Sequence, residues 1–318
     1  MTAGLSAPRA QSDPQTVPVT LLTGFLGAGK TTLLNRVLSD SHGQRIAVVV
    51  NEFGDIGVDG ALVEGADGEV VELANGCLCC ATRGQLLGAI AAVTGRGVPL
   101  DGIVIETSGL ADPFPVLSEL AHSSLTEILH VDGVITLVDA ENFDRNLDSA
   151  EAAFQQIVAA DLLLVNKVDL VAPEVPGLIE RGIRTLNPRA RITPCTGADV
   201  PLAMVLGSRL DSRAAPPAAP VRPHDPHHGG FHSLVLAPSG PLDPLRLQAW
   251  LSALPENVFR AKGLVRLTGH AGQVVVSAVG TRHGFSPARP GAGPDRLVVI
   301  GRDLDAPALR AGLEGCHA

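Results

Sequence analysis

Short runs of apolar and β-branched residues alternate along most of the chain with stretches whose apolar positions recur every three or four residues. The first pattern predicts buried strands, and the second predicts helices that bury one face. Because the two alternate, the sequence predicts an α/β fold with a doubly wound, mostly parallel sheet and helices on both faces. The predicted strands cover residues 17–22, 46–50, 70–73, 103–106, 134–139, 162–166 and 192–194. The predicted helices cover residues 30–39, 82–94, 113–122, 150–159 and 176–186.

The alternation stops at residues 207–230, which are rich in Pro, Ala, Arg and His and have no apolar period. This composition is typical of a linker or a surface loop. Four further strands and two helices then follow in the order β-α-β-β-β-α, which describes a small α+β domain. The strands are predicted at 232–237, 264–268, 273–279 and 296–300, and the helices at 244–254 and 306–315. We therefore expect a disordered N-terminus at 1–16, a first domain at 17–206, a linker at 207–230 and a C-terminal domain at 231–318.

The composition narrows the range of partners. The 318 residues include 24 Lys and Arg against 33 Asp and Glu, which gives a net charge of −9, and no basic block is present. Nucleic acid is therefore not an expected partner. Residues 1–15 lack the features of a signal peptide, and no apolar run approaches the ~20 residues needed to cross a bilayer. These patterns predict a cytoplasmic protein without a membrane partner, whose cysteines are thiols or metal ligands.

The strongest motif is Gly-Phe-Leu-Gly-Ala-Gly-Lys-Thr at residues 24–31, directly after a predicted strand and directly before a predicted helix. It has the spacing of a P-loop. The glycines let backbone N–H groups turn toward phosphate oxygens, Lys30 reaches the β- and γ-phosphates, and Thr31 supplies a hydroxyl for Mg²⁺. A glycine-rich turn with a surface lysine is the alternative, which this placement disfavours. The predicted phosphate-binding residues are Gly24, Gly27, Ala28, Gly29, Lys30, Thr31 and Thr32.

A second motif, Asn-Lys-Val-Asp at residues 166–169, predicts the choice of base. It follows an apolar strand, and parallel sheets bind ligands at the carboxyl ends of their strands. Guanine presents two adjacent donors, which the acceptor-only Asp169 can pair, whereas adenine would leave the carboxylate unpaired. Asn166 is expected to brace the site, Lys167 to lie over the base, and the turn at Thr196 to offer a backbone donor. GTP is therefore the expected nucleotide.

A third element, Glu-Thr-Ser-Gly-Leu-Ala-Asp-Pro at residues 106–113, closes another apolar strand. Glu106 is expected to hold Mg²⁺ through water, and Gly109 to donate its N–H to the γ-phosphate. A strand-end turn with a helix cap is the alternative reading. We predict GTP hydrolysis with Lys30, Thr31, Glu106 and Gly109 as the catalytic residues. The carboxylates clustered at residues 51–59 are further candidates for Mg²⁺, the attacking water or a second metal.

Three of the five cysteines lie together as Cys77, Cys79 and Cys80, after an Asn-Gly turn. Thiolates are soft ligands that favour Zn²⁺, and the turn lets neighbouring side chains converge. Three ligands leave a fourth position open for exchange, which Glu52 or water can fill. Buried structural thiols and a redox pair are the alternatives. Cys195 and Cys316 are isolated and are expected to be buried or incidental thiols.

With these motifs in view, the chain resembles the CobW-type metallochaperone GTPases, which are relatives of the urease- and hydrogenase-maturation GTPases. Five motifs carry the resemblance in order: the P-loop, Asn-Glu-Phe-Gly at 51–54, Asn-Gly-Cys-Leu-Cys-Cys at 75–80, the 106–113 segment and Asn-Lys-Val-Asp. The resemblance implies a GTPase that binds Zn²⁺ or Co²⁺ at the Cys-x-Cys-Cys motif and delivers it to a client metalloprotein under nucleotide control. Residues 254–263 also resemble the second domain of that family. The chain departs from the family at Asp55, where glutamate is common, and at residues 281–293, which replace an aromatic-rich segment.

Two other functions remain open from the sequence. A small-molecule kinase would share the P-loop but would have no use for Asn-Lys-Val-Asp. A passive metal buffer would use the cysteines and the histidines at 224, 227, 228 and 232, which equally fit a solvated loop. The sequence also leaves a homodimer open.

Overall fold

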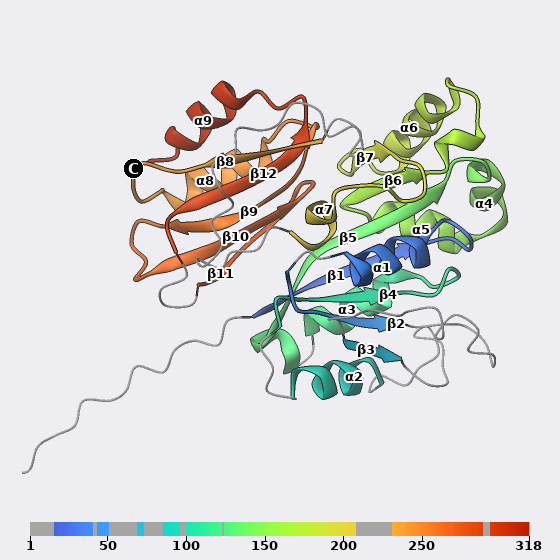
Figure 1. Ribbon diagram of the computed structural model, residues 1–318, viewed down its shortest axis with the longest axis horizontal. Coiled ribbons are helices and arrows are strands. Elements are labelled where there is room, and N and C mark those ends of the chain that lie inside the picture. The colour runs from blue at the N-terminus through green and yellow to red at the C-terminus, as the bar shows by residue number, and fades with distance from the viewer. Residues whose placement is uncertain are drawn as a thin grey trace, which may run out of the picture.

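The chain forms two sheets, which lie side by side in the computed structural model (Figure 1). The structure describes residues 16–40, 43–50, 69–72, 85–95, 100–122, 124–207, 231–288 and 293–317. The first sheet has seven strands in the order β3-β2-β4-β1-β5-β6-β7, and the second has five in the order β11-β10-β9-β12-β8.

All neighbouring strands of the first sheet run parallel, so their carboxyl ends share one edge. Its strands are β1 (Val17–Gly24), β2 (Ile46–Val50), β3 (Glu69–Glu72), β4 (Gly102–Glu106), β5 (Leu129–Asp139), β6 (Leu162–Asn166) and β7 (Arg191–Pro194). Its helices are α1 (Lys30–Ser39), α2 (Gln85–Thr94), α3 (Pro113–His122), α4 (Phe143–Ser149), α5 (Glu151–Ala159), α6 (Val175–Leu186) and α7 (Leu202–Leu206), with short 3-10 turns η2 (Ser124–Glu127) and η3 (Val168–Leu170).

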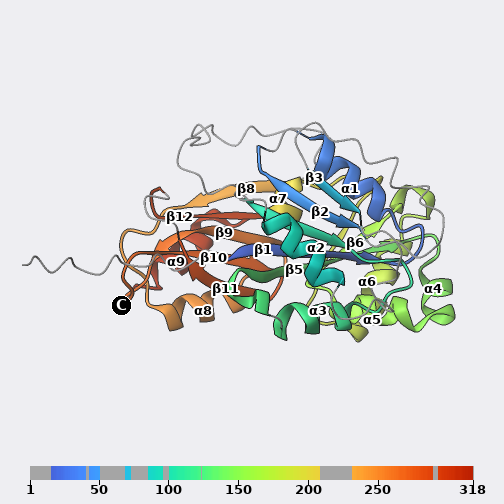
Figure 2. The same ribbon diagram turned by 90° about the horizontal axis from the view of Figure 1, so that it is seen from below.

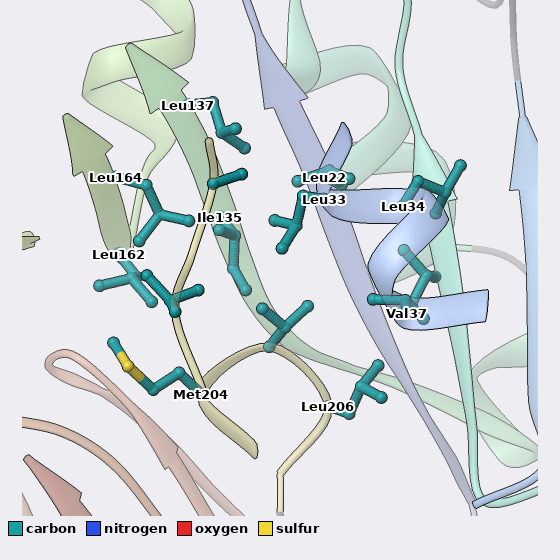
Figure 3. Packing of buried hydrophobic residues seen from close by; sticks show 14 of the residues in the cluster. Leu22, Leu33, Leu34, Val37, Ile135, Leu137, Leu162, Leu164, Met204 and Leu206 are labelled. Carbon is teal, nitrogen blue, oxygen red and sulfur yellow. The ribbon is translucent and has the colours of Figure 1, made fainter. Parts of the chain in front are cut away.

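Helices cover both faces of the parallel sheet, which explains why its strands are apolar at successive positions. Figure 2 shows α1 and α7 above the sheet and α3 and α5 below it. Alternate residues of a strand point to opposite faces. Leu22 of β1 therefore lies in one apolar cluster with Leu33 of α1 and Met204 of α7, part of which Figure 3 shows. Its neighbour Leu21 packs on the other face with α2 and α3.

The second sheet is antiparallel and carries two helices on one face. Leu247 and Leu251 of α8 and Leu309 and Leu313 of α9 pack there against the apolar side of the central strands. Asp243 and Asp305 cap these helices by accepting hydrogen bonds from backbone N–H groups three residues on. The elements are β8 (Phe231–Leu236), α8 (Pro244–Ser252), β9 (Val258–Arg266), β10 (Gln273–Val279), β11 (Arg282–Pro287), β12 (Arg296–Arg302) and α9 (Ala306–Glu314).

A buried ion pair joins the two sheets. Arg260 of β9, 1% exposed, donates to the carboxylate of Asp132 in β5 and to the carbonyls of Met204 and Val205, at 3.0 and 2.8 Å. The hydroxyl of Ser277 donates to the same carboxylate. This polar cluster, together with the buried hydrogen bonds from Arg191 of β7 to the carbonyls of Leu254 and Val258, fixes the two sheets to each other.

The predicted fold class is confirmed, but four details of the prediction are wrong. The second sheet has five strands rather than four, because β11 was missed; this edge strand is only partly buried and contains no β-branched residue, so it lacks the usual signal of a strand. β9 begins at Val258, earlier than predicted. β5 begins at Leu129 rather than 134, because the polar Asp132 finds a buried partner across the sheets. Helices α4 and α7 were also missed, since both are short. Among the described residues, no helix is long and apolar enough to cross a membrane.

Candidate nucleotide site

The P-loop connects the end of β1 to the start of α1 at the carboxyl edge of the parallel sheet. Gly29 precedes the helix with a φ of 107°, a conformation that favours glycine, and Lys30 is the first helical residue. The Lys30 ammonium reaches back across the loop and donates to the carbonyl of Gly24 at 2.8 Å and to that of Phe25 at 3.3 Å. Its charge is thus held at the loop, where phosphates would lie. Thr31 is half-buried and Thr32 is exposed on the next helical positions.

Asn166 joins the P-loop to the turn after β7. Its Nδ2 donates to the carbonyl of Ala28 at 2.9 Å, and its Oδ1 accepts from the N–H of Ala198 at 2.9 Å. A side chain at Gly29 would collide with this same amide group, so glycine is required there for close approach. Asn166 thus links two loops that are far apart in sequence.

Cys195 lies beneath this bridge as a buried thiol. Burial raises the pKa of Cys195 to about 12, so the sulfur keeps its proton and lies 3.6 Å from the Asn166 Oδ1 as a weak donor. The expectation that Cys195 and Cys316 are buried thiols is confirmed.

Lys167 and Asp169 follow directly after β6, at the carboxyl edge of the parallel sheet. Lys167 has a φ of 65°, and both Asp169 on η3 and Thr196 after β7 are exposed. The Lys167 ammonium is 2.8 Å from Oδ2 of Asp139, the last residue of β5. This pairing fixes the aliphatic stem of Lys167, while the Asp169 carboxylate faces solvent and can accept hydrogen bonds from a base.

Sequence analysis missed Asp139, although an acid at the carboxyl end of a buried parallel strand is a usable signal. Burial raises the pKa of Asp139, but hydrogen bonds from Lys167 and Asn142 and the charge of Lys167 lower it more, and the net pKa lies below the ordinary value. Asp139 therefore remains ionised beside Lys167.

The 106–113 segment lies against the P-loop. Glu106 ends β4, is buried, and is in register with Leu22 of β1. Next to it, the hydroxyl of Thr107 donates to that of Thr23 at 2.8 Å, and both residues are fully buried. A side chain at Gly109 would come within 2.8 Å of the Leu26 nitrogen. The structure thus places Gly109 against the P-loop and Glu106 at the end of the strand beside β1. Asp112 also caps α3 through the N–H of Phe114 at 2.9 Å.

Gln156 of α5 is a second contact that sequence analysis missed. Its Nε2 donates to the carbonyls of Gly109 and Ala111 at 3.1 and 3.0 Å. A single glutamine in an amphipathic helix carries no local sequence signal for such a contact.

The predicted metal ligands Glu52, Cys77, Cys79 and Cys80 lie outside the described residues, as do the carboxylates at 51–59 and the histidines at 224, 227 and 228. His232 lies on β8. Within the part of the chain that the structure describes, no three His, Cys, Asp or Glu side chains group as a metal site.

Comparisons with known proteins show the family of this chain. The family described as CobW/HypB/UreG, nucleotide-binding domain matches residues 18–194, and the cobalamin synthesis protein cobW C-terminal domain matches residues 231–317. The zinc chaperone CobW of Pseudomonas aeruginosa is 33% identical, covering 92% of this chain and 89% of its own. The zinc chaperone YjiA of Escherichia coli is 31% identical, covering 94% and 98%. A crystal structure of Zn(II)-bound YjiA GTPase from E. coli covers 95% of this chain and 99% of that chain at 27% identity, with a TM-score of 0.48.

Proposed function

Because this chain belongs to the CobW/HypB/UreG family and is a GTPase, we propose that it is a metallochaperone that delivers Zn²⁺ or Co²⁺ to a client protein under nucleotide control. The proposed metal ligands are Cys77, Cys79 and Cys80, with Glu52 or water at the fourth position. Thiolate ligands suit Zn²⁺, and the zinc chaperones to which the chain is similar favour zinc over cobalt as its cargo.

This proposal depends on one observation: the parallel strands β1, β2, β3 and β4 have their carboxyl ends at the same edge of the sheet. β3 runs parallel to β2, β4 and β1, so its carboxyl end lies on the same side of the sheet as the P-loop and Glu106. Cys77 follows five residues after Glu72, the last residue of β3. The chain thus enters the cysteine motif from the edge at which the nucleotide is expected, which supports coupling between metal and nucleotide.

The nucleotide half of the proposal assigns GTP to the P-loop and to Asp169. Lys30 neutralises phosphate charge, Asn166 keeps the P-loop and the base-binding turn together, and Lys167 is oriented by Asp139 to lie along the base. The hydroxyl of Thr31 and the carboxylate of Glu106 are hard oxygen ligands at one edge of the sheet, so they fit Mg²⁺. When bound, Mg²⁺ would neutralise charge that develops on the phosphates.

Asp169→Asn tests the choice of base. We expect GTP affinity to fall by about 10- to 100-fold, because a charged pairing with two guanine donors is lost. Xanthosine triphosphate affinity should rise, since the new amide can donate to the oxygen that replaces the amino group of guanine. Competition binding measures both changes.

Asp144→Asn is the matched control, because Asp144 is an exposed aspartate in the first turn of α4. It should leave both affinities unchanged. Equal binding of ATP and GTP by the wild type would show that Asp169 does not select the base.

Metal and nucleotide affinities should be coupled. We expect Zn²⁺ to bind about 5- to 150-fold more tightly with a non-hydrolysable GTP analogue than with GDP, since allosteric couplings of ~1–3 kcal/mol are typical. Linkage then requires Zn²⁺ to tighten the analogue by the same factor. Titrations of Zn²⁺ and Co²⁺ with the analogue, with GDP and without nucleotide measure the coupling.

Cys77→Ala, Cys79→Ala and Cys80→Ala should each remove the coupling and leave nucleotide affinity unchanged in metal-free buffer. Cys316→Ala, which truncates a buried thiol directly after α9, should retain it. Equal metal affinity in all three nucleotide states would contradict the metallochaperone mechanism and would favour a passive metal buffer.

A further inference from the structure

We propose that Gln156 is a positioning residue that orients the turn around Gly109, so that the protein binds GTP in preference to GDP. This inference rests on the proposed role of Gly109 as a donor to the γ-phosphate. It adds a residue of α5, outside every nucleotide-binding motif, to the part of the site that distinguishes the two nucleotides.

The turn at residues 108–111 is closed and lies against the P-loop. The N–H of Ala111 donates to the carbonyl of Ser108 at 3.0 Å, and Gly109 abuts Leu26 of the P-loop. On one side the turn continues from Thr107, whose N–H donates to the carbonyl of Leu22 at 2.9 Å. That side is therefore fixed to β1 through the backbone.

Gln156 holds the opposite side. Its carboxamide nitrogen uses both of its hydrogens, one toward the carbonyl of Gly109 at 3.1 Å and one toward that of Ala111 at 3.0 Å. Two carbonyl acceptors fix the orientation of the amide, because its oxygen could not face them. One side chain therefore holds the two carbonyls that flank Leu110, and with them the orientation of the turn.

The surroundings of Gln156 argue against a purely structural role. The residue is 1% exposed, and among the described residues its Oε1 has no hydrogen-bond partner. A buried polar atom without a partner destabilises the fold, which an apolar side chain of similar size would avoid. Gln156 also lines a small cavity together with Phe25 of the P-loop, Asp139 and Asn146. Its contacts to the turn thus lie next to residues of the nucleotide site.

Gln156→Met tests the inference, because methionine has nearly the same volume and no donor. We expect the affinity for a non-hydrolysable GTP analogue and the kcat for GTP each to fall about 10-fold, because two neutral hydrogen bonds to the turn are lost. GDP affinity should stay within about twofold of the wild type, because GDP has no γ-phosphate for Gly109 to contact. Should this variant fail to fold, Gln156→Asn is the second test, because it keeps the amide but is one methylene too short. It should likewise lower the affinity for the GTP analogue and leave GDP affinity nearly unchanged.

Thr136→Val is the matched control. The Thr136 hydroxyl is buried and donates to the backbone carbonyl of Gln156 at 2.8 Å. Removing this hydroxyl weakens the contact between β5 and α5 but removes no hydrogen bond to the turn at residues 108–111. It should lower the melting temperature without changing the ratio of GTP-analogue to GDP affinity. A wild-type ratio in Gln156→Met, or the same altered ratio in Thr136→Val, would overturn this inference alone. Equal affinity of the wild type for the analogue and GDP, together with no GTP hydrolysis, would overturn the proposed function as well.

Discussion

Lys30→Ala is expected to reduce GTP turnover by about 100- to 1000-fold, the effect of removing a preorganised group that stabilises developing charge. Lys30 begins α1 with its ammonium already at the loop, 2.8 Å from the Gly24 carbonyl. It therefore needs little rearrangement to meet phosphate. Turnover under saturating GTP, measured beside circular dichroism, gives the result.

Lys30→Met separates the charge from the packing of the side chain. Lys30 is 8% exposed, so its stem contributes to the core, and methionine retains that stem. The two variants should lose the same turnover, and both should keep the wild-type circular dichroism spectrum. Undiminished turnover in either variant would remove Lys30 from the mechanism.

Arg260→Met is expected to lower the free energy of unfolding by about 3–5 kcal/mol, because it leaves the carboxylate of Asp132 buried without its main partner. The substitution also removes the donor to the carbonyls of Met204 and Val205. Denaturant unfolding measures the loss. Arg266→Met is the matched control: Arg266 forms an ion pair with Asp295 at 2.7 Å but is 57% exposed, so its loss should change stability by about 0–1 kcal/mol.

The double variant Asp132→Asn with Arg260→Met should recover part of the lost stability, since the uncompensated carboxylate is removed, while the buried Lys262 loses Asp132 as its opposite charge. A double variant as unstable as Arg260→Met alone would show that packing, rather than the uncompensated carboxylate, causes the loss.

Acid should lower the stability of the wild type, because protonation of Asp132 breaks its ion pair with Arg260. Burial raises the pKa of Asp132, but the charges of Arg260 and Lys262 and the hydrogen bond from Ser277 lower it more, so the net pKa lies below the ordinary value. The contribution of Asp132 is therefore fully present above the ordinary pKa of the carboxyl and is lost as the pH falls through the lower, folded-state pKa. Replacing Arg260 should reduce the pH-dependent change in unfolding free energy that Asp132 causes.

The sequence by itself determined the features that depend on local backbone chemistry. The glycine spacing at residues 24–31 fixes a turn that only glycine adopts easily, and the apolar runs of β1, β4 and β6 identify strands buried on both faces. Each nucleotide motif follows such a strand, so its place at the carboxyl edge of the sheet follows from topology. For this reason the fold class, the family and the phosphate- and base-binding motifs were readable without coordinates.

Only the tertiary structure decided which distant side chains complete these motifs. Asp139 pairs with Lys167, Gln156 holds the turn at Gly109, and Arg260 neutralises Asp132 across the two sheets. None of these pairs follows a helical or strand period, because each joins separate elements whose approach is set by packing of the whole core. Asp132 shows the reason most directly: a charged residue in a strand signals an interruption unless a buried partner compensates it, and that partner, Arg260, lies 128 positions later in the chain.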